Sequence, residues 1–265
     1  MARGWSFCLG MSLLGLAVAC APGAQQRRLM PQEVIDLGAL VTPDLPEQFW
    51  GRALLTAMGF DQQNEFRVVP WSVGSGDARV SGQNSYYTLF NHGGPHVDAP
   101  NHFGFAEGLD GYPVESFVGP LKVFDVRDAG LGSTVGPEYF EGRVEPGDVV
   151  LIYTGYEPPA GDDLPSVRAL SREAAEYLAQ LPIRAFGTDA MSIDSAQGVA
   201  PADAPTARAR LAPVHDAILS RGIPAYEQLL NLDRLVGRER LLFVGAPLNI
   251  QSGDGVPVRP VALVY

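Results

Sequence analysis

Three of the four histidines of this 265-residue chain fall within eleven residues, at His92, His96 and His102, with Asp98 between the last two. The intervening glycines and prolines would break a helix, so a helical face cannot display these side chains. In an extended segment the side chains alternate between two faces, and all four residues share one parity. The spacing therefore predicts that three imidazoles and one carboxylate lie close together.

Two imidazoles and a carboxylate from one short segment match the ligands that Zn²⁺ or Mn²⁺ requires, with positions left open for water. The alternative is that each histidine is a loop residue bonded to the backbone, which would be the better interpretation of a single histidine. The even spacing of the whole set favours a metal site. One or two divalent ions there would lower the pKa of water to about 7 and polarise an acyl oxygen, which predicts a hydrolase. These ligand types suit zinc and manganese alike.

The fourth histidine, His215, follows Pro213 at the start of a predicted helix. The positive end of the helix dipole disfavours an imidazolium there and keeps the ring available as a neutral ligand. Glu227 lies twelve residues further on, beyond Gly222, at what the sequence suggests is the start of another extended segment. A helix followed by a tight return would bring His215 and Glu227 to the same site.

Short runs rich in apolar and β-branched residues predict the strands that must position these side chains. The runs are Val34 to Leu37, Leu121 to Val126, Asp148 to Thr154, Arg184 to Gly187, Arg240 to Gly245 and Val258 to Val264. Helical patterns cover Ser171 to Leu181, with Ser171 as N-cap, and Ala212 to Arg221, ended by Gly222. A further helix over Phe49 to Phe60 is less clear, because prolines crowd its start.

The order of these elements predicts an α/β fold: a single domain over residues 34–265 with a twisted mixed sheet or barrel-like sheet and flanking helices. No linker or repeat interrupts it, and no glycine-rich turn has the phosphate-binding spacing of a nucleotide fold. The net charge of −11 without a basic run excludes nucleic acid as a partner.

The first twenty residues have the features of an export signal: Arg3, an apolar stretch from Phe7 to Val18, and small residues before Cys20. This end resembles a bacterial lipoprotein signal, which implies that Cys20 is acylated. Cleavage near Ala24 as an ordinary signal is the alternative. Residues 1–20 are thus interpreted as signal and 21–33 as a short tether. An exported protein on the periplasmic face of the envelope, held at the outer membrane only by its lipid, is expected.

The stretch from His92 to Phe103 resembles the signature of the cyclase family, which includes bacterial kynurenine formamidase and isatin hydrolase. Other segments agree, among them Gly147 to Leu151, Gly187 to Asp189, His215 to Glu227 and Gly253 to Gly255, so the resemblance covers essentially the whole mature chain. Pro95 departs from it, because the family normally has threonine at this position.

The resemblance implies that His92, His96 and Asp98 bind a first metal and that Asp98 bridges to a second one, held by His215 and Glu227. His102 would be the catalytic residue that transfers the proton. The activity implied is hydrolysis of an amide-type C–N bond in a small aryl formamide or cyclic amide, by an enzyme that assembles as a homo-oligomer. Trp71 and Phe103 are the aromatic residues expected to contact the substrate.

Two other functions remain open from the sequence. A lactone or ester hydrolase of the same family would use the same residues. A non-catalytic envelope lipoprotein could retain the metal for binding or for structure, although a structural zinc site normally has four protein ligands, often cysteines. Both cysteines of this chain, Cys8 and Cys20, lie in the predicted signal.

Overall fold

The computed structural model describes residues 30–57, 59, 63–158, 166–195 and 206–265. The predicted signal peptide, Cys20 and most of the predicted tether lie outside the described residues. Within the described part of the chain, no helix is both long enough and apolar enough to cross a membrane.

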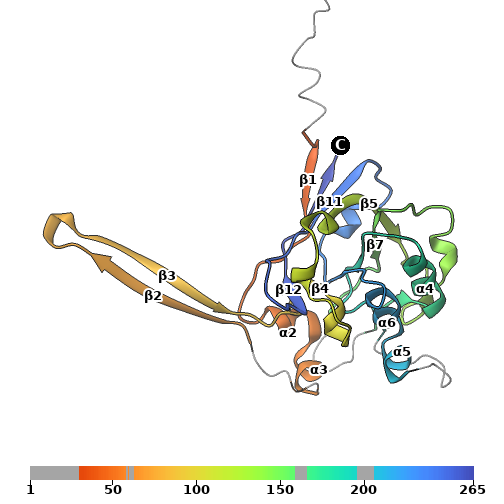
Figure 1. The fold of residues 1–265 in the computed structure, drawn as a ribbon, viewed down its shortest axis with the longest axis horizontal. Helices are drawn as coiled ribbons and strands as arrows, with labels where there is room; N and C mark the ends of the chain where they lie inside the picture. The colour runs from red at the N-terminus through yellow and green to blue at the C-terminus, as the bar shows by residue number, and fades with distance from the viewer. Residues whose placement is uncertain (1–29, 58, 60–62, 159–165, 196–205) are drawn as a thin grey trace, which may run out of the picture.

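Nine strands form one strongly curled mixed sheet, in the order β1-β13-β11-β5-β7-β9-β10-β4-β12 (Figure 1). Its central strands β5, β7, β9 and β10 are parallel, and antiparallel strands flank them on both sides. The strands are β1 Glu33–Asp36, β4 His96–Asp98, β5 Val118–Asp125, β7 Val149–Tyr153, β9 Ala185–Thr188, β10 Ala225–Glu227, β11 Leu241–Val244, β12 Gly255–Pro257 and β13 Val261–Val264. The predicted α/β fold with a barrel-like sheet is confirmed.

The two faces of this sheet bury separate apolar clusters. Val149 and Leu151 of β7 point into the cluster inside the curl, which also contains Tyr226 and Phe243. The alternate residues of β7 point to the other face. There they pack with Leu178 and with the other apolar residues of α4 Arg172–Gln180 and α6 Pro213–Leu219.

Both predicted helices on that outer face are confirmed. The Ser171 side chain accepts a hydrogen bond from Ala174 N and caps α4, as the sequence predicts. Helix α6 begins at Pro213, where a missing amide hydrogen costs nothing. The third predicted helix is divided: Gly51, with φ of 74°, separates α2 Leu45–Trp50 from α3 Arg52–Ala57.

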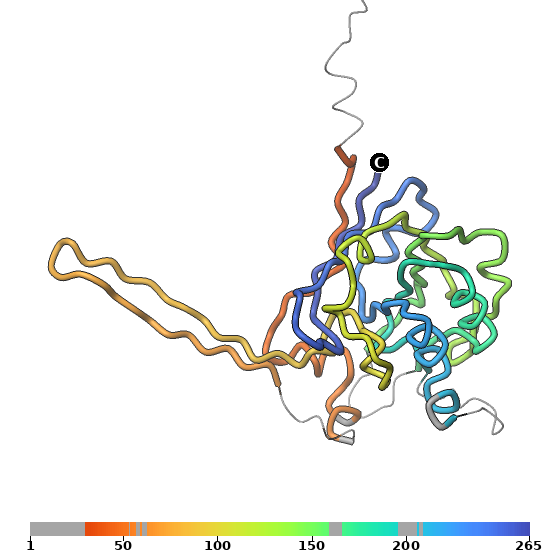
Figure 2. The backbone as a smooth tube through the Cα atoms, viewed as in Figure 1, coloured from red at the N-terminus to blue at the C-terminus, as the bar shows by residue number. Residues whose placement is uncertain are grey.

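A long hairpin of β2 Glu65–Val73 and β3 Val80–Thr88 extends away from the body of the molecule (Figures 1 and 2). Among the strands of the described residues, β2 and β3 pair only with each other. The sequence prediction missed them, because both faces of the hairpin are exposed and no buried face imposes an alternating apolar pattern.

The remaining elements are short and occupy the connections. They are 3₁₀ helices η1 Gly76–Ala78, η2 Pro100–Phe103, η3 Leu109–Gly111, η4 Val114–Phe117, η5 Pro137–Tyr139 and η6 Leu232–Leu235, helix α5 Ala207–Leu211, and the strand pair β6 Thr134–Val135 and β8 Ala169–Leu170.

Candidate functional site

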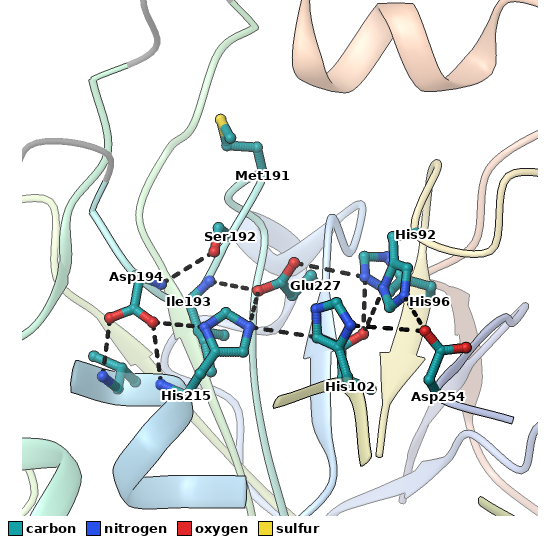
Figure 3. Close-up of polar contacts among 12 residues, drawn as sticks. His92, His96, His102, Met191, Ser192, Ile193, Asp194, His215, Glu227 and Asp254 are labelled. Carbon is teal, nitrogen blue, oxygen red and sulfur yellow. Dashed lines mark hydrogen bonds and ion pairs between the residues drawn. The ribbon is translucent and has the colours of Figure 1, made fainter. Parts of the chain in front are cut away.

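All four histidines meet at one end of the sheet, together with Asp98 and Glu227 (Figure 3). His96 and Asp98 lie two residues apart on β4, so the pleat points both to one face. Glu227 ends the neighbouring strand β10, where it pairs with His96. His92 precedes β4 in a turn, and His102 follows it in η2. The predicted convergence is confirmed, but the predicted extended geometry applies only to His96 and Asp98.

Asp98 lies at the centre of this group and is fully buried. Its Oδ1 is 2.8 Å from His92 Nδ1 and 3.2 Å from His96 Nε2, and its Oδ2 is 3.6 Å from His215 Nε2. Glu227 closes the other side, with Oε1 at 3.3 Å from His215 Nε2 and Oε2 at 3.5 Å from His96 Nε2. One carboxylate therefore faces three imidazoles.

The outward nitrogen of each of these three rings is held by an oxygen. His96 Nδ1 is 2.8 Å from the carbonyl of Gly94, and His215 Nδ1 is 2.6 Å from Asp194 Oδ2. His92 Nε2 is 3.3 Å from Asp254 Oδ2. A carbonyl or carboxylate oxygen can only accept, so each outward nitrogen carries the hydrogen. A neutral ring then points its inward lone pair toward Asp98 and Glu227, the arrangement seen in metal-binding histidines.

The atoms that point into the site show whether a cation fits there, because several of them have no hydrogen-bond partner. His96 Nε2 and both carboxylate oxygens of Asp98 are buried without a hydrogen bond of acceptable geometry, although His92 Nδ1 lies 2.8 Å from Oδ1. Unpaired polar atoms are costly inside a protein. A divalent cation bound among His92, His96 and Asp98, whose ligand atoms all lie within 4.8 Å of one another, would satisfy them. The residues therefore fit the ion.

Without a cation, protons take its place. Burial alone would lower the pKa of His92, but the charge of Asp98 and the bond to Asp254 outweigh it and raise the pKa to about 10. The pKa of His215 is likewise raised, because its hydrogen bond to Asp194 and the nearby carboxylates of Asp98 and Glu227 outweigh its burial. The predicted effect of the helix dipole on His215 is thus wrong in direction for the metal-free protein, since three carboxylates dominate it.

His102 differs from the other three rings. Burial lowers its pKa and outweighs the opposite effect of Asp98, so the ring is neutral at pH 7. It stacks on His92 with ring centroids 4.1 Å apart, and its Nδ1 lies 3.8 Å from Asp254 Oδ2. Its side chain keeps 29% of its surface exposed, toward the cavity beside the site. A neutral and accessible imidazole can accept and return a proton.

A cavity of about 420 Å³ adjoins the cluster and is lined mainly by apolar side chains. They include Trp50, Leu54, Phe90, Phe103 and Met191. A larger cavity of about 670 Å³ is lined by other residues, none of them a histidine. The smaller cavity is therefore the one that can present a substrate to the cluster.

Phe103, one of the two predicted substrate contacts, lies in this cavity and stacks on the ring of His215, with centroids 4.3 Å apart. Trp71, the other, is on strand β2 of the projecting hairpin, paired with Gly82. Trp71 is not among the residues that line this cavity within one chain, so its contact with the substrate stays a prediction. Trp50 lines the cavity wall instead and donates its indole N–H to the carbonyl of His92.

Sequence reasoning missed or undervalued three residues that support the ligands. Asp254 lies in a Gly-Asp-Gly pattern that is typical of a turn, and this pattern does not indicate any contact with a metal ligand. In the structure Asp254 contacts His92 and accepts a hydrogen bond from Asn91 Nδ2 at 2.9 Å. Asp194 holds His215. Gln228 is fully buried and accepts from Gly94 N while donating toward the carbonyls of His92 and Met191. Its only sequence signal is its position beside Glu227.

Pro95 replaces the hydroxyl of the expected threonine without unfolding the ligand loop. Its carbonyl accepts a hydrogen bond from Val258 N at 2.9 Å. Gly94, with φ of 81°, makes the turn before it, and a side chain there would collide with Leu45. The loop is thus fixed on both sides of Pro95.

The geometry defines an α/β domain that presents a buried cluster of imidazoles and carboxylates suited to a divalent cation. The chain belongs to the cyclase family: the family model described as "Putative cyclase" matches residues 35–195. It is 31% identical over 228 residues to a kynurenine formamidase of Maricaulis maris, covering 85% of this chain and 95% of that protein. It is also 26% identical over 211 residues to an isatin hydrolase of Roseibium aggregatum, covering 68% and 74%.

The fold is also similar to solved structures. The structure of isatin hydrolase A from Labrenzia aggregata bound to benzyl benzoate aligns with a TM-score of 0.65 and 27% identity, covering 88% of this chain and 93% of that one. Isatin hydrolase A from Ralstonia solanacearum aligns with a TM-score of 0.67 at 22% identity, which supports the fold.

Proposed function

We propose that this protein is a metal-dependent hydrolase of an amide-type C–N bond in a small aryl formamide or cyclic amide. The names of its relatives, kynurenine formamidase and isatin hydrolase, support this reaction class. One observation carries the proposal: His96 Nε2 and both oxygens of Asp98 are buried without partners and face the same point. A divalent cation bound between them would satisfy the imidazole nitrogen and the carboxylate together.

His92, His96, Asp98, His215 and Glu227 would hold one or two ions, Zn²⁺ or Mn²⁺. Bound there, the ion supplies an activated water and polarises the substrate's acyl oxygen. Asp98, between the two groups of histidines, is the residue suited to bridging. Elemental analysis of the purified protein identifies the metal and its stoichiometry.

The other residues of the site would position the substrate and transfer the proton. Phe103 and Trp50 form aromatic walls on which a planar aryl group can lie. His102 opens on the same cavity, so its neutral ring takes a proton from the attacking water and returns it to the departing nitrogen. Asp254, beside His102 Nδ1, favours the protonated ring during this transfer.

His102→Ala tests the proton-transfer role. We expect unchanged metal content and a fall in kcat of about 10²- to 10⁴-fold, because general acid and base help is typically worth that much. Steady-state kinetics and elemental analysis measure the two effects, and free imidazole should restore part of kcat. Turnover at the wild-type rate would rule out the assignment, and loss of metal would make His102 a ligand instead.

A panel of substrates distinguishes amide hydrolysis from ester hydrolysis and from a non-catalytic role. N-formylkynurenine and isatin represent the amides, and simple lactones and aryl benzoates represent the esters. The ester alternative has a specific basis, since an aromatic ester, benzyl benzoate, is bound in a similar structure. Metal-loaded protein that turns over none of them would favour the non-catalytic binding protein.

We further propose that the protein is exported and anchored through an acylated Cys20. The supporting observation is the sequence alone: an apolar stretch followed by Ala17-Val18-Ala19-Cys20. An exported enzyme would meet amides, lactams or lactones of the envelope rather than products of tryptophan breakdown in the cytoplasm. Labelling with a palmitate analogue should mark the wild-type chain and leave Cys20→Ser unmarked. Labelling that survives in Cys20→Ser, or none in the wild type, contradicts the anchor.

A further inference from the structure

The cavity beside the histidine cluster has two chemically different parts. One part is formed by the histidines and Glu227 of the site described above, and the other is lined by the aliphatic side chains of Leu54, Met191 and Leu211. Leu54 packs against the small apolar cluster that contains Met191. Figure 3 shows the Met191 side chain directed away from the histidines. A substrate with its amide at the histidines would therefore place the rest of its structure against hydrocarbon.

The polar side chains that adjoin this aliphatic part already have partners within the protein. Both carboxylate oxygens of Asp194 accept hydrogen bonds from the first turn of α6. Glu227 Oε1 accepts from Ile193 N at 2.7 Å, and Ser192 Oγ accepts from Asp194 N at 3.2 Å. These groups hold the metal site together, so they are poorly placed to pair with a charged substituent on a substrate.

No lysine or arginine is found among the described residues that line the cavity. The internal segments outside the description, residues 58, 60–62, 159–165 and 196–205, contain neither residue type in the sequence. The net charge of the whole chain is −11, which also disfavours an anion nearby. A carboxylate at the far end of a substrate would thus lose its water shell and gain no cationic partner, at a high cost in free energy.

We propose that the substrate is an uncharged aryl amide or lactam whose ring carries a hydrocarbon substituent, and that the cavity selects against amides that carry an amino acid group. The inference rests on the hydrolase function proposed above and narrows its substrate class. The substituent lies against Leu54 and Met191 and leaves past Leu211, which is 62% exposed at the rim. The volume of about 420 Å³ is in the range of pockets for drug-sized ligands, so the substituent has room.

Two formamides that differ in the amino acid group alone test this selectivity. N-formylkynurenine and N-(2-acetylphenyl)formamide share the ring, the formamide and the ketone. Hydrolysis of either consumes one water, breaks the formyl C–N bond and releases formate and the arylamine. We expect kcat/KM to be at least about a hundredfold higher for the uncharged compound, because the carboxylate of the other would be desolvated without a partner. An equal or higher kcat/KM for N-formylkynurenine overturns the inference and leaves the hydrolase function intact.

A longer hydrocarbon substituent tests the aliphatic part of the cavity. N-(2-pentanoylphenyl)formamide has three more methylenes than the acetyl compound. We expect its kcat/KM to be higher, by up to about fourfold for each methylene that is buried. A kcat/KM that falls with the added methylenes would contradict the predicted place of the substituent.

Binding of the amine products separates this inference from the proposed function, because it needs no turnover. Calorimetric titration of the purified protein compares kynurenine with 1-(2-aminophenyl)pentan-1-one. We expect the uncharged ketone to bind at least about a hundredfold more tightly. Comparable affinities, tighter binding of kynurenine or binding of neither overturns the inference. Preference for the ketone without turnover of any formamide would instead sink the hydrolase function and support the selectivity.

A cation added at the rim of the cavity should remove part of the selectivity. Leu211→Arg replaces an exposed side chain, so circular dichroism and metal content should not change. Its guanidinium can pair with the carboxylate of kynurenine, which should then bind at least about tenfold more tightly than to the wild type. Leu131→Arg adds the same charge at a residue that is 64% exposed and does not line the cavity, and it should bind kynurenine as the wild type does. Equal affinities in the two variants overturn the inference, because the missing cation would not then set the selectivity.

Discussion

The three imidazole rings around Asp98 are each held by a further contact on the side that faces away from it. Oxygens of Gly94, Asp194 and Asp254 hold the outward nitrogens of the three rings. Each ring is therefore fixed in orientation before any ion binds, and loss of the inward proton leaves the hydrogen on the outward nitrogen, which reduces the entropy lost on binding. The charges of His96 and His92 hold the pKa of Asp98 well below its usual range despite complete burial.

Gly255 lies against the ring of His92 and so affects the affinity for metal. Gly255 pairs with Asp98, and a Cβ at Gly255 would lie 2.3 Å from His92 Cε1. We expect Gly255→Ala to push His92 off the site and weaken metal affinity about 10- to 100-fold, as the loss of an orienting contact does. Calorimetric titration measures the affinity. Gly111→Ala, whose added Cβ meets nothing within 4 Å, is the matched control, and equal affinities in both variants would contradict the steric argument.

Helix α6 and the metal site share one carboxylate. Asp194 Oδ1 accepts from Val214 N and its Oδ2 from His215 N, so Asp194 satisfies the first turn of α6. The same Oδ2 accepts from His215 Nδ1. Formation of the helix and orientation of the ligand are therefore one event.

Asp194→Ala should consequently have two effects. We expect a loss of about 1 to 2 kcal/mol in the free energy of unfolding, as for other caps, and a roughly 10- to 100-fold weaker metal affinity. Ser171→Ala, which removes the cap of α4 far along the chain from any ligand, should lose similar stability and keep its affinity. Denaturant unfolding and metal titration of both variants distinguish the effects. An unchanged affinity in Asp194→Ala would show that the cap does not orient His215.

The elements that sequence predicted are those with a buried face. Strand β7 lies within its predicted range because Val149 to Ile152 are all buried between two cores. The site strands β4, β10 and β12 have only three residues each, and β12 was not predicted. The predicted extended segment from His92 is reduced to β4, and β10 ends at Glu227, where the sequence suggested that a segment begins. The histidine cluster was predictable from spacing, whereas the contact of Asp254 with His92 spans 162 residues and has no local signal.

For the whole molecule, the cation would join segments far apart along the chain: the loop from His92 to His102, helix α6 and strand β10. Binding to the folded state alone stabilises it by about 2.7 kcal/mol at a metal concentration a hundredfold above Kd. For a domain of this size that corresponds to a rise in Tm of roughly 5 to 10 °C. Removal of the metal by a chelator should reverse this rise in Tm.

This rise in Tm should increase with pH between about 6.5 and 10. Metal must displace the protons of His92, with its pKa near 10, and of His215, so binding tightens as pH rises. The raised pKa of His92 also stabilises the metal-free protein below pH 6.5, and that stability is lost as pH approaches 10. Tighter metal binding and the lower stability of the metal-free protein both make the metal-induced rise in Tm larger at higher pH. Thermal scans with metal and with chelator across this range measure the difference; a constant difference would contradict the proton displacement.

At the edge of the sheet, β1 pairs with β13, its only neighbour among the strands of the described residues, with Glu33 opposite Val264. The two strands are separated by nearly the whole described chain, so their pairing closes a very long loop and is a non-local step of folding. A variant without residues 261–265 would lack β13 and leave the backbone of β1 unpaired, as an open edge for chaperones and proteases.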